Sequence, residues 1–148
     1  MSEPIGIEIR NLYKIFGARG AEYVDAVNRG MTKQELNDKH RHVLGLRDIN
    51  ISIPAGAIQV VMGLSGSGKS TLIRHINRLI EPTAGQIVIE GQDVVTMAPE
   101  ALRAFRRHKT AMVFQKFALL PHRTVLDNAA YGLEVQGISE AERYRTAM

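Results

Sequence analysis

The sequence contains no cysteine and no tryptophan, and aromatic residues make up only 5% of its 148 positions. The absence of cysteine excludes disulfides and thiolate metal sites, and it suits a reducing cytoplasm. No apolar run approaches the roughly 20 residues that a membrane-spanning helix needs, so direct insertion into a bilayer is not expected. The first residues also lack the basic region and apolar core of a signal peptide.

Charge of one sign is not concentrated in any part of the chain. The net charge is +4 and the isoelectric point is about 9.6, a balance that can favour nucleic acid or an anionic membrane surface. The cations are scattered, however, and the densest group, residues 106–109, stands near the end of an expected helix, where cations complement the helix dipole. No aromatic residues are interleaved with them. We therefore expect a solvated surface and no nucleic-acid partner.

The stretch Gly63–Thr71 matches the phosphate-binding pattern G-x-x-x-x-G-K-[ST] at every fixed position. Residues 57–62 before it form an apolar, β-branched run that is typical of a buried parallel strand. After it, apolar residues recur with helical spacing from Leu72 to Ile80. Strand, glycine loop and helix therefore follow one another in the order that this motif requires.

Each part of the motif has a chemical role. Glycines let successive backbone N–H groups converge on one phosphate, and the start of the following helix adds partial positive charge. Lys69 can reach the β- and γ-phosphates, and the Ser70 hydroxyl can ligate Mg²⁺. An ordinary glycine- and serine-rich loop is the alternative. The pattern predicts a nucleoside triphosphate site at Gly63, Ser65, Gly66, Ser67, Gly68, Lys69, Ser70 and Thr71.

The remaining patterns indicate an α/β protein. Alternating or apolar runs predict strands at residues 7–12, 47–53, 86–90 and 111–114. Capping-box patterns predict helices that begin after Thr32, Thr124 and Ser139, and Pro99 suits the first turn of another helix. No internal repeat or low-complexity segment is present.

A second group of residues, downstream of the phosphate loop, indicates which kind of phosphate-loop protein this is. Val113-Phe114-Gln115 ends the predicted strand, and the run from Phe117 to Asn128 follows it. Together with the phosphate loop, this cluster resembles the first part of an ABC-type ATPase. The resemblance implies that Gln115 contacts Mg²⁺ and the attacking water, and that its loop senses a membrane partner. Taken alone, Gln115 is more typical of a surface-loop glutamine, and the whole cluster favours the functional interpretation.

The segment Asn11–Gly17 resembles the stretch in which this family stacks an aromatic ring on adenine. By position the stacking residue is Phe16, with Tyr13 as a packing residue, and the alternative is that Phe16 belongs to the core. The insertion near residues 17–45 and the flanks of the phosphate loop are similar to the ATP-binding subunits of glycine betaine/proline (quaternary amine) importers. ATP and Mg²⁺ are the implied cofactors.

The same resemblance implies partners and a location. The partners are a second ATPase subunit in a head-to-tail dimer, membrane permease subunits and a separate solute-binding protein. The location is peripheral, on the cytoplasmic face of the inner (plasma) membrane.

The 148 residues contain no LSGG-type signature, no apolar strand that ends in Asp-Glu and no switch histidine in a recognisable context. The resemblance therefore predicts the N-terminal part of such a subunit, inactive by itself. It would comprise an ABC-type P-loop core at about 1–123, with an antiparallel β edge, and the start of the helical subdomain at about 124–148. A nucleic-acid-acting ABC-type NTPase and a non-catalytic regulatory module are the alternatives.

Overall fold

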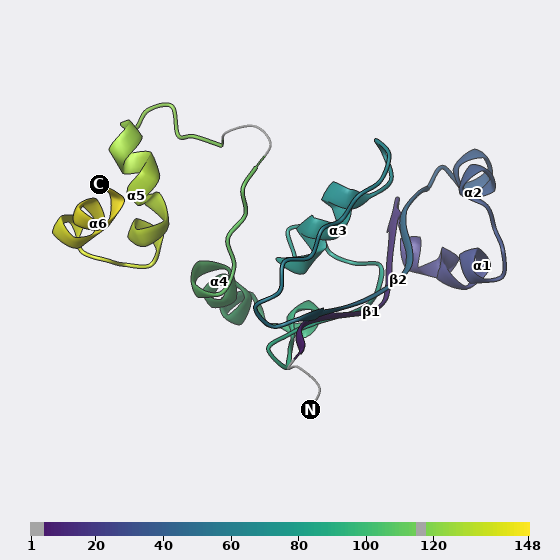
Figure 1. Ribbon diagram of the computed structural model, residues 1–148. Coiled ribbons are helices and arrows are strands. Elements are labelled where there is room, and N and C mark those ends of the chain that lie inside the picture. Colours follow the sequence, from purple (N-terminus) through teal and green to yellow (C-terminus); the bar gives the residue numbers. More distant parts are fainter. Residues whose placement is uncertain (1–4, 115–117) are drawn as a thin grey trace. The chain divides into compact units, whose positions relative to one another are not determined.

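The computed structural model describes residues 5–114 and 118–148 (Figure 1). The chain forms two compact units, the first ending at Met97 and the second running from Ala98 to Met148. The expected division into a core at 1–123 and a helical part from 124 stays a prediction.

The first unit is built on a four-stranded antiparallel sheet in the order β2-β1-β3-β4. The strands are β1 (Ile5–Phe16), β2 (Val43–Pro54), β3 (Ala84–Ile89) and β4 (Gln92–Asp93). The two long strands pair along most of their length. This sheet is the predicted antiparallel part of the fold. Both long strands extend beyond the segments that the alternating pattern predicted.

The insertion between β1 and β2 is helical. It contains a 3₁₀ turn (Gly20–Tyr23), α1 (Val24–Asn28) and α2 (Lys33–His40), and Figure 1 shows the two helices beside the ends of the long strands. The predicted capping box forms at Thr32, whose hydroxyl accepts the N–H of Glu35. A small apolar core fixes the insertion to β1, and its buried members are Ile15, Val27 and Leu36.

The helix after the glycine loop, α3, runs over Lys69–Ile76 and is shorter than predicted. Beyond it Arg78 adopts a left-handed conformation with φ 51°, which ends the helical path before Leu79 and Ile80. The inward side of α3 joins the main core, which consists of Ile9, Leu12, Leu46, Leu72 and Ile87. A short 3₁₀ turn at Val94–Thr96 follows β4.

The second unit is helical within the described residues. It contains α4 (Pro99–His108), α5 (Val125–Val135) and α6 (Glu140–Ala147). Pro99 occupies the first turn of α4, as expected, and α5 begins with a complete capping box from Thr124. The helix predicted after Ser139 is present, but the Ser139 side chain makes no capping bond, so that part of the prediction was wrong.

Two predicted strands do not form. Residues 57–62 and 111–114 carry no strand assignment, and Ile58 and Val113 are 95% and 97% exposed. A buried parallel strand needs ladder partners and helices on both faces. Neither segment is paired with any strand in the described part of the chain. Among residues 5–114 and 118–148, no helix combines the length and apolar character needed to cross a bilayer.

Candidate functional site

The glycine loop encloses a small cavity of about 180 Å³ between its last turn and the start of α3. The residues that line it are consecutive: Gly66, Ser67, Gly68, Lys69, Ser70 and Thr71. The first N–H groups of an α-helix have no partner within the helix, and Gly68 contributes no side-chain cap to α3. These N–H groups are therefore available to an anion at the positive end of the helix dipole.

Two glycines are required by the backbone of this loop. Gly66 and Gly68 have φ of 77° and 92°, in the left-handed region that other residues adopt only with strain. A Cβ on Gly68 would also lie 2.7 Å from the carbonyl oxygen of Gly45. Gly68 therefore allows the loop to lie directly against β2.

Lys69 lies across the inside of the loop. Its Nζ donates to the carbonyl oxygens of Gly63 and Leu64 at 2.8 and 2.7 Å, and Ser67 Oγ lies 3.4 Å away. These bonds hold an ammonium beside the cavity, where it can meet the charge of a terminal phosphate. The predicted contact of Lys69 with phosphate stays a prediction.

The hydroxyl residues of the loop are solvent-accessible. Ser65 and Ser70 are exposed, and Thr71 is half-buried. Ser70 opens the first turn of α3 and lines the cavity, as a ligand of a phosphate-bound cation must. No cluster of three or more His, Asp or Glu side chains able to hold a metal occurs among the described residues. A cation here would depend on hydroxyl, amide and phosphate oxygens.

A buried histidine lies under the loop. His75, on the inward side of α3, is 0% exposed, and its Nδ1–H donates to the carbonyl oxygen of Thr71 at 2.7 Å. Burial lowers the pKa of the His75 imidazole, and the Thr71 carbonyl opposes that shift only in part. The sequence analysis gave His75 no role, although its place on the apolar face of the helix pattern indicated burial.

The two aromatic candidates of β1 differ in environment. Tyr13 is 5% exposed, and its hydroxyl donates to Asn28 Oδ1, so it packs as expected. Phe16 ends β1 with 39% of its surface exposed, and the Lys14 ammonium lies 5.1 Å from the centre of its ring. Part of the Phe16 ring therefore remains accessible to solvent.

Gly45 connects Phe16 to the glycine loop. It is an unpaired residue in β2, because Ile15 lies opposite Leu44 and Lys14 opposite Leu46. A Cβ on Gly45 would lie 2.7 Å from Cε2 of Phe16, so the ring rests on the backbone of β2. The carbonyl oxygen of the same glycine lies against Gly68. Gly45 precedes the strand predicted at residues 47–53, so no local pattern marked it as a bulge.

Gln115 lies outside the described residues. The structure brings the residues from Gly66 to Thr71 together around one cavity and places both Phe16 and Gly68 against Gly45. The position of Gln115 and the binding roles of all these residues stay predictions.

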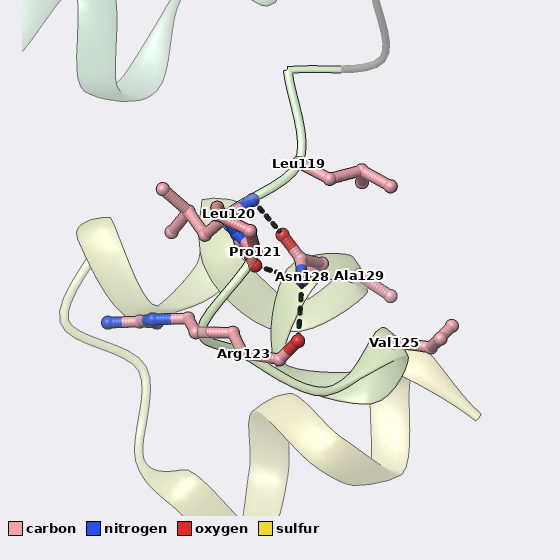
Figure 2. A pocket seen from close by; sticks show the side chains of 7 residues that line it. All are labelled: Leu119, Leu120, Pro121, Arg123, Val125, Asn128 and Ala129. Atoms are coloured by element: carbon pink, nitrogen blue, oxygen red, sulfur yellow. Dashed lines mark hydrogen bonds between the residues drawn. The ribbon is translucent and has the colours of Figure 1, made fainter.

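In the second unit, Asn128 fixes the loop at residues 118–124 through hydrogen bonds. Its Oδ1 accepts the N–H of Leu120 at 2.7 Å, and its Nδ2 donates to the carbonyl oxygens of Leu120 and Arg123 (Figure 2). Nδ2 also donates to the carbonyl oxygen of Thr124. In Figure 2 the side chains of Leu119, Val125 and Ala129 extend to one side of this loop and that of Arg123 to the other. Asn128 ends the run from Phe117 that carries the family resemblance, and the sequence pattern predicts no role for its side chain.

The loop at residues 118–124 borders a cavity of about 380 Å³. Its lining residues are Leu119, Leu120, Pro121, Arg123, Val125, Asn128 and Ala129. Leu119 and Val125 are 64% and 88% exposed, so this surface presents large apolar side chains to solvent.

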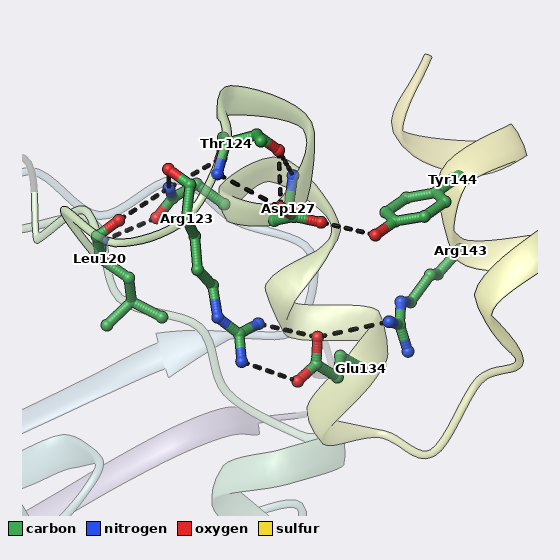
Figure 3. A network of polar contacts seen from close by, with 8 residues as sticks. Leu120, Arg123, Thr124, Asp127, Glu134, Arg143 and Tyr144 are labelled. Carbon is green, nitrogen blue, oxygen red and sulfur yellow. Dashed lines mark hydrogen bonds and ion pairs between the residues drawn. The ribbon is translucent and has the colours of Figure 1, made fainter.

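A polar network holds α5 and α6 together (Figure 3). Arg123 binds both carboxylate oxygens of Glu134 at 2.8 and 3.0 Å, and Arg143 approaches the same carboxylate at 3.6 Å. These contacts, led by the hydrogen bond from Arg123, lower the pKa of Glu134. Tyr144 Oη donates to Asp127 Oδ1, which lowers the pKa of Asp127 further than the Thr124 cap alone. The network sets the geometry of the helix pair and contains no catalytic arrangement.

The sequence of this chain is similar to those of known proteins. Residues 46–148 match the sequence model of the family described as "ABC transporter". The chain is 49% identical over 144 residues to the glycine betaine/proline betaine transport system ATP-binding protein ProV of Escherichia coli, which covers 97% of this chain and 36% of that protein. It is 47% identical over 146 residues to the glycine betaine transport ATP-binding protein OpuAA of Bacillus subtilis, covering 99% and 35%.

A solved structure gives the same result for the fold. The dimeric, post-hydrolysis state of the ATP-binding cassette MJ0796, bound to ADP and Pi, superposes with a TM-score of 0.75 at 28% identity, covering 95% of this chain and 53% of that one. The chain spans about a third of the length of the curated relatives it matches.

Proposed function

The chain belongs to the ABC transporter family, and from that premise we propose that it forms the ATP-binding part of an importer for glycine betaine, proline betaine or a related quaternary amine. Two named relatives serve transport of these solutes and are 47% and 49% identical to it. The observation that carries the proposal is the glycine-loop cavity, whose Gly68 lies against Gly45, the residue on which the Phe16 ring rests.

The nucleotide would bind across the first unit. Adenine would stack on the exposed part of the Phe16 ring, and the phosphates would accept N–H groups from the first turn of α3 and the Lys69 ammonium. Ser70, with Gln115, would ligate Mg²⁺, which neutralises charge on the β- and γ-phosphates when bound. The remaining proposed contacts, from Gly63, Ser65, Ser67 and Thr71, shape and line the loop.

Binding and turnover are separable in this chain. Hydrolysis needs a group that orients and activates water, and general-base catalysis contributes about 10²–10⁴ in rate. The 148 residues contain no Asp-Glu at the end of an apolar strand and no signature segment to act on a second subunit. We therefore expect residues 1–148 alone to bind ATP weakly and to hydrolyse it at close to the background rate.

The apolar cavity around Leu119, Val125 and Ala129 supports a membrane partner. Exposed leucine and valine beside an ordered loop form a surface of the kind that marks protein–protein contacts. We place the permease subunits here, with the chain held peripherally at the cytoplasmic face of the inner membrane. A second ATPase subunit, head to tail, and a separate solute-binding protein complete the proposed assembly.

Nucleotide titration followed by amide NMR tests the function. ATP with Mg²⁺ should shift the amide signals of Gly66 and Gly68, and Lys69→Ala should weaken the affinity at least tenfold, because a charge-assisted contact to phosphate contributes about 1.5–3 kcal/mol. Lys39→Ala is the matched control, since Lys39 is a mostly exposed cation on α2. Absence of any ATP-dependent shift would contradict the proposed function. Phosphate release that Lys69→Ala abolishes would contradict the expected lack of turnover.

A further inference from the structure

A second cavity of the first unit, of about 440 Å³, opens between the insertion and β2. Three residues of α2 line it, Lys33, Gln34 and Asn37, together with Val43 at the start of β2. Lys33 and Asn37 are four positions apart and Gln34 and Asn37 three, so the three side chains share one face of the helix. The volume is in the range of small-molecule sites.

This cavity is linked to the proposed nucleotide site through β2. Val43 lies directly opposite Phe16 in the antiparallel pair, so their side chains project from the same face of the sheet. Gly45, two residues further along β2, carries the Phe16 ring and touches Gly68 of the glycine loop. Cavity, ring and phosphate loop thus follow one another along β2.

The polar groups around the cavity suit a nucleoside. The amides of Gln34 and Asn37 each present a donor and an acceptor, and neither makes a hydrogen bond to another described residue. An amide of this kind can pair with the donor and acceptor that adenine offers side by side.

The helix that carries these groups is fixed in place. Leu36 is fully buried in the insertion core, and the Thr32–Glu35 capping box sets the first turn of α2. Gln34 and Asn37 flank Leu36 and are therefore presented from a rigid element, which lowers the entropic cost of binding.

We propose that α2 completes the nucleoside end of the ATP site, with Gln34 and Asn37 hydrogen-bonding to adenosine while Val43 and Phe16 cover its apolar surface. This inference rests on the proposed function. It assigns the insertion a role in nucleotide affinity rather than in contact with another protein.

The test compares ATP with inorganic tripolyphosphate, which carries the phosphates and no nucleoside. Affinities for both are measured by calorimetry or NMR for the wild-type chain, Gln34→Ala, Asn37→Ala and the double variant. Each single variant should weaken ATP binding about two- to tenfold, as expected for the loss of one hydrogen bond, and leave tripolyphosphate binding unchanged. Asp38→Ala, at an exposed position of α2 that does not line the cavity, is the matched control and should change neither.

The outcomes separate the two proposals. Unchanged ATP affinity in the double variant, with Lys69→Ala still weakening both ligands, would overturn the role of α2 and leave the proposed function standing. Equal losses for ATP and tripolyphosphate would also overturn it, because they would indicate a general disturbance of the fold. A wild-type chain that binds neither ligand would refute the proposed function and this inference with it.

Discussion

Gly45 lies between two parts of the candidate site, although no ligand contact is proposed for Gly45 itself. The Phe16 ring occupies the space that a Cβ on Gly45 would fill, and the Gly45 carbonyl oxygen lies where a Cβ on Gly68 would be crowded. The backbone of Gly45 therefore contacts both the aromatic ring and the phosphate loop. Such a contact leaves little freedom of movement on the β2 side, because backbone atoms have no rotamers to change.

His75 links stability of the loop helix to pH. Because burial lowers its pKa, the unfolded chain takes up the proton more readily than the folded chain. The contribution of neutral His75 is therefore complete above the unfolded pKa of about 6.5 and is lost as pH falls from there through the folded pKa.

We expect the free energy of unfolding to fall between pH 7.5 and 5.5, and His75→Gln to flatten that dependence. Chemical denaturation at a series of pH values measures the slope. His108→Gln, at an exposed histidine of α4, is the matched control and should keep the wild-type slope. Identical slopes for wild type and His75→Gln would show that another group carries the pH dependence.

At the scale of elements, α5 also holds in place the loop that precedes it. Asn128 satisfies both the N–H and the C=O of Leu120 from one turn inside the helix, so the loop cannot move without opening polar groups. The Thr124–Asp127 capping box closes the same turn. The apolar surface beside Leu119 is thus presented from an ordered loop.

Asn128→Ala should release this loop, at a cost of about 1–3 kcal/mol for the backbone groups left without partners. Hydrogen exchange is the direct measurement: the Leu120 amide should lose protection. Asn128→Asp keeps an acceptor for that amide and should retain most of the protection, while losing the bonds that Nδ2 donates. Equal exchange rates in the alanine and aspartate variants would contradict this account.

Local sequence patterns predicted the elements that are locally determined. The capping boxes at Thr32 and Thr124 and the proline start of α4 are confirmed because their partners lie within one helical turn. The Ser139 pattern correctly predicted the start of α6 but not a capping bond, since the Ser139 side chain makes none. The bulge at Gly45 could not be predicted, because it depends on the register of two strands.

At the scale of the whole molecule, the exposed segment 57–62 is the main departure from the expected fold. Ile58, Val60 and Met62 are 95%, 63% and 86% exposed, with no ladder partner among the described residues. Unpaired backbone next to alternating apolar side chains is a template for pairing with another strand.

We therefore expect the isolated chain to self-associate as its concentration rises. Light scattering coupled to gel filtration should show the mean mass increasing, and Val60→Lys should shift the onset to higher concentration. Gln59→Lys adds the same charge without removing an apolar side chain, so it should have the smaller effect. A monomer at every concentration would show that the segment is protected in solution.

The sequence alone determined the phosphate motif, the helix starts and the family resemblance, because each depends on residues that are near neighbours in the chain. It also indicated an α/β chain with an antiparallel edge. The tertiary structure decided that Phe16 meets the loop through Gly45, that α2 adds a cavity beside Val43, and that residues 57–62 remain unpaired. These features depend on strand register and on which surfaces meet, and such long-range contacts leave no local pattern in a single sequence.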